Sequence, residues 1–141
     1  MQITRQADYA LRAMLFLARL APGERAATSQ IAKEMQIPAS FLAKIISQLS
    51  IAGLIQTSRG AHGGVKLARQ PDQVSLLDVV EAIDGPIALN ECTEDPSVCA
   101  FGDNCPLHDV WCEAQADLVH KLRAETFDKL LEREQEIAAK S

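Results

Sequence analysis

A helix–break–helix pattern in the first third of the chain is the feature that most limits how this sequence can fold. The stretch "TSQIAKEMQIPASFLAKIISQLSIA" predicts a short helix that begins at Ser29, capped by Thr28, and a second helix over 39–52. A short break that contains Pro38 separates the two helices. This arrangement is typical of a helix-turn-helix, in which the first helix braces the second against DNA.

The second predicted helix has two chemically different faces. Its apolar residues recur at helical spacing and predict a buried stripe that contains Leu42, Ile45 and Leu49. Lysine and glutamine side chains can bond to base edges, and serines suit phosphates. An ordinary solvated helix face is the alternative. We expect the polar side to face DNA through Ser40, Lys44, Ser47 and Gln48.

A glycine-rich hairpin follows this helix directly. In "LIQTSRGAHGGVKLAR", a β-rich run leads to a tip with three glycines and then to a returning run, which predicts a two-stranded wing. Neither a Walker lysine nor a dinucleotide-binding spacing is present, so a nucleotide loop is disfavoured. Basic groups on or near the tip suit phosphates or a minor groove, and we expect DNA contacts from Arg59, His62 and Lys66.

The charge of the chain is divided between its halves. Residues 1–70 carry nine Lys and Arg against three Asp and Glu, whereas residues 71–141 carry five against sixteen. This asymmetry indicates a nucleic-acid surface in the first half, although solvated faces with a chance distribution are an alternative. An enzyme is not expected, because the sequence has no CxxC redox pair, no nucleophile–base pairing and no nucleotide loop.

Three further helices complete the expected fold. One precedes the helix-turn-helix over 4–20, one lies in "SLLDVVEAIDGP", and a long one begins at Pro106 and runs to about 138. The last would be about 50 Å long. A single amphipathic helix of that length has to bury its apolar stripe, and a two-fold partner would cover it.

The expected fold class is therefore mainly α with a small β-wing. We expect a winged helix-turn-helix DNA-binding domain over 1–85, a cysteine-rich loop over 86–105, and a long dimerisation helix and tail over 106–141.

All four cysteines fall in "ECTEDPSVCAFGDNCPLHDVWC". The sequence has no readable signal peptide, and its best apolar run, "AMLFLA", is too short to span a membrane. We therefore expect a cytoplasmic protein with no membrane association. In that reducing compartment, clustered cysteines serve as metal ligands or redox-active thiols more often than as disulfides.

The cysteine spacing favours an iron–sulfur cluster over zinc. The gaps of six and five residues suit an open loop of three thiolates with a fourth ligand from elsewhere. Zinc is the runner-up, with "CPLH" as a Cys and His pair, but zinc loops use shorter gaps. Cys105 precedes Pro106 at the expected start of the long helix, where the helix dipole favours a thiolate.

The chain resembles the BadM/Rrf-type winged-helix transcription regulators over nearly its whole length. The matching stretches are "DYALRAMLFLA", "IPASFLAKIISQLSIAGLI", "SRGAHGGVKLAR", "SLLDVVEAIDGP", and Cys92, Cys99 and Cys105 followed by His108. The resemblance implies a homodimer that binds a pseudo-palindromic operator in double-stranded DNA. It also implies that an iron–sulfur cluster on the three cysteines, [2Fe-2S] ahead of [4Fe-4S], sets operator affinity by sensing iron–sulfur status, oxidants or nitric oxide.

The fourth cluster ligand has two candidates. His108 lies one helical turn beyond Cys105 and is favoured, while Asp8, as the resemblance implies, would reach the cluster across a dimer. Cys112 is additional to the family pattern, and we expect a half-buried helix cysteine there. Two other functions stay open: a regulator with a cluster-free thiol redox switch, and a zinc-stapled winged-helix module that binds proteins.

Overall fold

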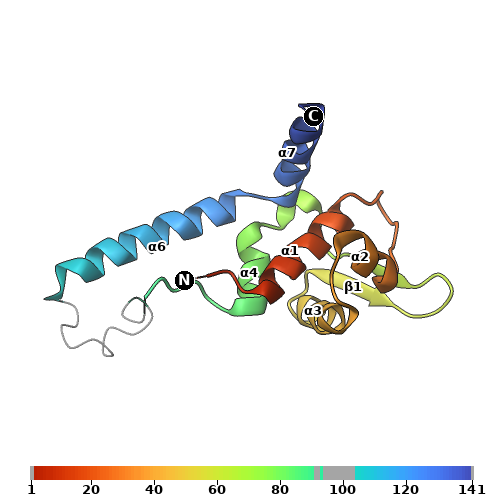
Figure 1. The fold of residues 1–141 in the computed structure, drawn as a ribbon, viewed down its shortest axis with the longest axis horizontal. Coiled ribbons are helices and arrows are strands. Elements are labelled where there is room, and N and C mark those ends of the chain that lie inside the picture. The colour runs from red at the N-terminus through yellow and green to blue at the C-terminus, as the bar shows by residue number, and fades with distance from the viewer. Residues whose placement is uncertain (1, 91–92, 94–103, 141) are drawn as a thin grey trace.

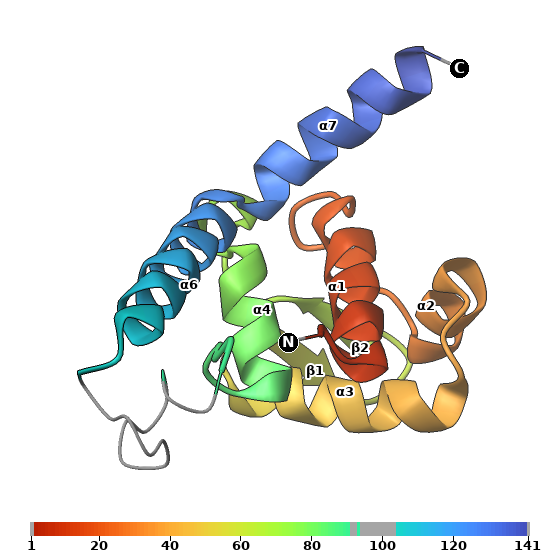
Figure 2. The same ribbon diagram turned by 60° about the vertical axis from the view of Figure 1, so that its left-hand side comes forward.

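The computed structural model describes residues 2–90, 93 and 104–140, and it is mostly helical (Figures 1 and 2). The expected fold class is confirmed, with one two-stranded sheet among the described residues. The elements follow the order α1 (Arg5–Ala18), α2 (Thr28–Met35), α3 (Ala39–Ile51), β1 (Ile55–Ser58), β2 (Gly64–Leu67), a short 3-10 turn (Pro71–Gln73), α4 (Leu76–Asp84), α6 (Pro106–Ala124) and α7 (Phe127–Ala139).

Helix α1 runs through the middle of the body and packs against α2, α3, α4 and α7. Thr4 caps its start by accepting a hydrogen bond from the Ala7 N–H at 3.0 Å. The Thr4 hydroxyl also donates to Asp84 Oδ1 at 2.6 Å, which ties the start of α1 to the end of α4. The side of α1 that faces the core combines small and large side chains, and Ala7, Ala10, Ala13 and Met14 are all fully buried.

The helix-turn-helix consists of α2 and α3. Gln36 follows the end of α2 in the C-cap position with a left-handed backbone at φ 55°, and Pro38 occupies the N-cap position of α3. The expected cap on α2 was wrong. Thr28 is itself helical, so Ala27 occupies the cap position and provides no side-chain hydrogen bond.

The wing is an antiparallel pair in which Ile55 lies opposite Leu67. Ala26 extends this sheet through a β-bridge with Val65, with backbone hydrogen bonds of 2.8 and 3.0 Å. Gly64 makes this close approach possible. A Cβ on Gly64 would lie 2.8 Å from the Ala26 carbonyl oxygen, and its φ of 141° is rarely adopted by other residues.

The prediction of a single helix over 106–138 was wrong, because the helix is interrupted between α6 and α7. At the break, the Leu76 N–H donates to the Glu125 carbonyl at 2.9 Å, and the Phe127 N–H donates to the Val74 carbonyl at 3.1 Å. Thr126 forms a β-bridge with Ser75 between these two bonds. The extended backbone directs Phe127, which is 1% exposed, into the main core.

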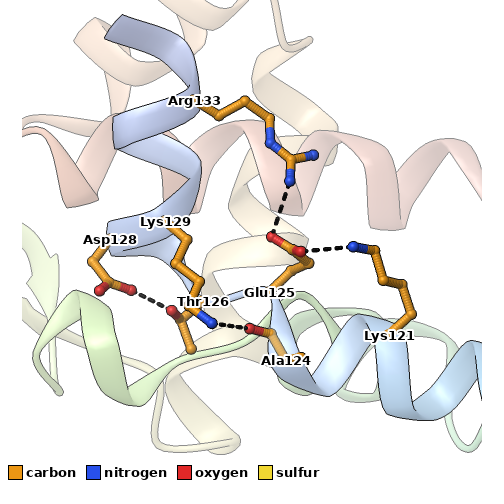
Figure 3. A network of polar contacts seen from close by, with 7 residues as sticks. All are labelled: Lys121, Ala124, Glu125, Thr126, Asp128, Lys129 and Arg133. Carbon is orange, nitrogen blue, oxygen red and sulfur yellow. Dashed lines mark hydrogen bonds and ion pairs between the residues drawn. The ribbon is translucent and has the colours of Figure 1, made fainter. Parts of the chain in front are cut away.

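Charged side chains surround this break (Figure 3). The Glu125 carboxylate accepts from Lys121 Nζ at 2.9 Å and pairs with Arg133 at 3.4 Å. The Lys121 hydrogen bond holds the pKa of Glu125 below its ordinary value; partial burial acts in the opposite direction, and Arg133 and Lys129 add to the lowering. Lys129 Nζ also donates to the Ala124 carbonyl at 3.0 Å. These contacts link the last turn of α6 to the first turns of α7.

Among the described residues, the C-terminal half of α6 makes the apolar contacts with the body. There Leu118, Val119 and Leu122 contact a small core cluster built from α4 and Ile87. The N-terminal half projects away from the body (Figures 1 and 2) and leaves an apolar face uncovered, with Leu107 and Val110 62% and 55% exposed. None of the described helices combines the length and apolar character needed to cross a membrane.

Candidate functional site

The polar stripe of α3 is accessible over three of its four expected residues. Ser40, Lys44 and Ser47 are all exposed. They recur at intervals of four and three residues, so they share one face of the helix. Ile51 continues the same spacing and is 85% exposed, which extends this face to the end of α3.

Gln48 lies on the flank of this face. It follows Phe41 by seven residues and therefore shares its side of α3, and the Phe41 ring meets Tyr9 of α1 edge-on at 5.8 Å. Gln48 is half-buried, and its Oε1 atom is buried without a hydrogen-bond partner among the described residues. The structure therefore does not group Gln48 with the three exposed residues.

A groove lies on the other side of the stripe, between α2, α3 and the wing. It consists of two hollows of about 270 and 460 Å³ that share Thr28 and Ile46. Thr28 and Ser29 border it at the start of α2, where no side chain caps the helix. Free N–H groups at a helix start attract anions. The sequence interpretation missed these two hydroxyl residues, because it assigned Thr28 to the cap.

Ala43 lines the same groove from α3, and its small side chain leaves the groove open. Arg59 and Gly60 border the opposite end. Arg25 lies next to the wing and hydrogen-bonds to the Ser58 hydroxyl. The groove is thus bordered by hydroxyls and by the wing arginine, next to the lysine of the stripe.

The three basic residues expected on the wing separate into two groups. Arg59 and His62 are exposed at the tip. Lys66 is half-buried in β2. Its neighbour Val65 borders the groove, and adjacent residues of a strand point to opposite faces, so Lys66 points away from the groove. Lys66 instead lines a separate hollow of about 500 Å³ with the end of α1.

The two cysteines that the structure describes, Cys105 and Cys112, lie at the start of α6 and in its first half. Cys105 occupies the N-cap position of α6 without a side-chain capping hydrogen bond, and its thiol is free and half-buried. Cys112 is also free, and its Sγ lies 3.4 Å from Nε2 of His108. Nδ1 of His108 is buried and has no hydrogen-bond partner in the described part of the chain.

Of the remaining expected ligands, the structure describes Asp8 alone. Cys92 and Cys99 lie outside the described residues. Asp8 pairs with Arg12 on α1 at 2.8 Å, and the start of α6 projects away from α1 (Figure 2). No group of three or more metal-ligating side chains forms within residues 2–90, 93 and 104–140.

The chain before the cysteine segment is fixed to the same helix that follows it. The Leu89 N–H donates to Oε1 of Gln115 at 3.0 Å, and Ile87 packs against the C-terminal half of α6. Cys105 then begins α6 itself. Both ends of the segment between Leu89 and Cys105 are therefore attached to α6, at points about ten residues or 15 Å apart along the helix.

Comparisons with known proteins agree with this architecture. A family model described as "Rrf2: Iron-dependent Transcriptional regulator" matches residues 3–133. The HTH-type transcriptional regulator NsrR of Shouchella clausii (strain KSM-K16) is 31% identical over 140 residues, which make up 99% of this chain and 94% of that protein.

Two solved structures have a similar fold. The structure of T. potens IscR matches with a TM-score of 0.78 at 22% identity, over 97% of this chain and 90% of that one. CymR, the global cysteine regulator of B. subtilis, matches with a TM-score of 0.77 at 26% identity, over 92% of this chain and 95% of that one.

Proposed function

This chain belongs to the Rrf2 family of transcriptional regulators, and we propose that it binds a pseudo-palindromic operator as a homodimer whose DNA affinity is set by an iron–sulfur cluster. The observation that carries the DNA part is the groove between α2, α3 and the wing. It lies beside the exposed face of α3, in the half of the chain where basic residues outnumber acidic ones.

The residues around this groove divide into two kinds of DNA contact. Thr28, Ser29 and Arg59 offer N–H, hydroxyl and guanidinium donors, which suit phosphates and position a protein on the duplex. Lys44 and Ser47 project from α3, the element that would enter the major groove and read base edges. His62 adds a contact at the wing tip. Gln48 and Lys66 would contribute less, because both are half-buried and face other parts of the body.

The apolar face of α6 supports the homodimer. Leu107, Val110 and Trp111 are 62%, 55% and 41% exposed on the half of α6 that leaves the body. A second copy of the same helix would cover this face, and a two-fold dimer presents two reading helices to two half-sites.

The described ligand candidates fit an iron–sulfur cluster. Cys105 presents a free thiol at the start of α6, and His108 has a buried nitrogen that lacks a partner among the described residues. Cys92 and Cys99 would complete the set. Asp8 is the alternative fourth ligand, but its carboxylate is already paired with Arg12. When bound, the cluster supplies iron that exchanges electrons and reacts with oxidants or nitric oxide, and [2Fe-2S] is expected ahead of [4Fe-4S].

A cluster-free thiol switch is the second candidate function, and the free thiols of Cys105 and Cys112 support it. Anaerobic purification distinguishes the two. We expect a brown protein that contains iron and sulfide and that loses its visible absorbance in Cys92→Ala, Cys99→Ala and Cys105→Ala. Colourless protein with oxidant-dependent DNA binding would favour the thiol switch, and colourless zinc-containing protein without DNA binding would favour a protein-interaction module.

DNA binding is tested separately on a two-fold symmetric site. Arg59→Ala should weaken binding to all sequences and reduce the salt slope by about 1, whereas Lys44→Ala should change the preference at one base pair by about 1–3 kcal/mol. Lys66→Ala is the matched control on the other face of the wing. Salt-independent binding without preference for symmetric sites would contradict the proposal.

A further inference from the structure

Cys112 and His108 form a contact that the four-ligand cluster site does not use. Cys112 Sγ lies 3.4 Å from Nε2 of His108, one helical turn earlier. We propose that Cys112 is a positioning residue, which accepts a hydrogen bond from Nε2–H of His108 and leaves Nδ1 as the nitrogen that ligates the cluster. This inference rests on the proposed function with His108 as the fourth ligand.

The two nitrogens of His108 have different surroundings. A neutral imidazole carries one N–H and one lone pair, so the partner of one nitrogen decides what the other can do. If Nε2–H donates to the Cys112 sulfur, Nδ1 presents its lone pair. If Nδ1 carried the proton, no described residue would accept it, because Nδ1 is buried without a partner. A metal at Nδ1 satisfies the first arrangement and cannot satisfy the second.

Helix geometry places Cys112 one turn after His108 on the same face of α6. Cys105 precedes the helix at its N-cap position, where the backbone is extended. Side chains in a helix lean toward its N-terminus, so the His108 side chain is directed back toward Cys105 and Cys112 leans over it from the next turn. Cys112 therefore contacts the imidazole from the C-terminal side of His108 along α6.

This arrangement matches how proteins orient ligating histidines. Such a histidine donates its second ring N–H to an acceptor, which fixes both the tautomer and the ring orientation. A carboxylate or backbone carbonyl is the usual acceptor; here the thiol sulfur, a weaker acceptor, occupies that place.

The first test uses the 141-residue chain without metal. Long-range ¹H–¹⁵N spectra at pH 8 report which nitrogen of each histidine carries the proton, and His108→Gln identifies the His108 signals. We expect the Nε2–H tautomer in wild type and in Cys112→Ser, which keeps an acceptor, and faster exchange of that proton with water in Cys112→Ala. An Nδ1–H tautomer in wild type, or the same exchange rate in Cys112→Ala, would overturn the inference.

The second test uses protein purified anaerobically with its cluster. Cys112→Ala should keep wild-type iron and sulfide content but shift the electron paramagnetic resonance spectrum of the reduced cluster, with partial return in Cys112→Ser. Glu113→Ala, an exposed neighbour on α6, should change neither property. If wild-type protein contains the cluster and Cys112→Ala has the same electron paramagnetic resonance spectrum, the positioning role is contradicted and the proposed function is not. Wild-type protein without iron and sulfide contradicts the proposed function itself.

Discussion

The backbone N–H of Phe127 donates to the carbonyl oxygen of Val74 at 3.1 Å, so the first residue of α7 is held against the segment that leads into α4. The Phe127 side chain is 1% exposed. We expect Phe127→Ala to lower the free energy of unfolding by about 3–5 kcal/mol, measured by urea denaturation at one chain concentration. Ile137→Ala, on an exposed part of α7, should change it by less than about 0.5 kcal/mol. Equal losses in the two variants would contradict the core position of Phe127.

Gly64 is expected to tolerate a side chain less well than Gly23. Both have positive φ, but a Cβ on Gly64 would lie 2.8 Å from the Ala26 carbonyl oxygen, whereas a Cβ on Gly23 would meet nothing within 4 Å. Gly64→Ala should therefore lower the melting temperature more than Gly23→Ala and should also weaken DNA binding, because it separates Ala26 from the wing. Thermal melts and binding titrations of both variants check this, and unimpaired DNA binding in Gly64→Ala would count against a role for the bridge.

The exposed half of α6 should control assembly without controlling the fold. Val110→Asp and Trp111→Glu change residues that are 55% and 41% exposed, so we expect monomers by sedimentation with unchanged helix content by circular dichroism. Leu118→Asp differs, because Leu118 packs on the α4 cluster and its loss should also lower helix content. Dimers that persist in Val110→Asp and Trp111→Glu would place the interface elsewhere.

The pKa of Glu125 predicts how the junction responds to acid. The Lys121 hydrogen bond lowers this pKa in the folded protein, and Arg133 and Lys129 add to the effect. A carboxylate whose pKa is lower in the folded protein than in the unfolded protein stabilises the fold at pH values above its unfolded-state pKa. This stabilisation is lost as the pH falls through the folded-state pKa. We expect Glu125→Gln to be less stable than wild type at pH 7 and the difference to shrink below about pH 4.5. Glu132→Gln, an exposed carboxylate on α7, should show no such convergence in denaturation curves.

The order of helices and the wing could be predicted from the sequence because local signals agree there. Pro38 and the glycines at 60, 63 and 64 interrupt clear periodic segments. The break between α6 and α7 could not, because the apolar repeat continues through it. Thr126 followed by Asp128 is a local helix-start signal, but the extended backbone depends on pairing with residues 74–76, which are 50 positions earlier in the chain.

The residues of the candidate DNA surface could be predicted only where a single helix or hairpin determines whether their side chains are exposed. Ser40, Lys44 and Ser47 share a helix face whatever surrounds them, and the wing tip extends Arg59 into solvent. The exposure of Gln48 and Lys66 depends on neighbouring elements. Gln48 lies on the side of α3 that meets α1, and Lys66 lies beside the end of α1. Helical spacing alone would have paired Cys112 with His108, since residues four apart are neighbours on a helix.

The attachment of the cysteine segment to α6 at both ends affects how this region can vary in length. Gln115 fixes the chain at Leu89 and the helix start fixes it at Cys105, so a residue inserted between them displaces neither α4 nor α6. The entropy of closing such a loop rises slowly, by about 0.6 kcal/mol for each doubling of its length. A residue added between these two attachment points is therefore expected to cost little of the free energy of unfolding.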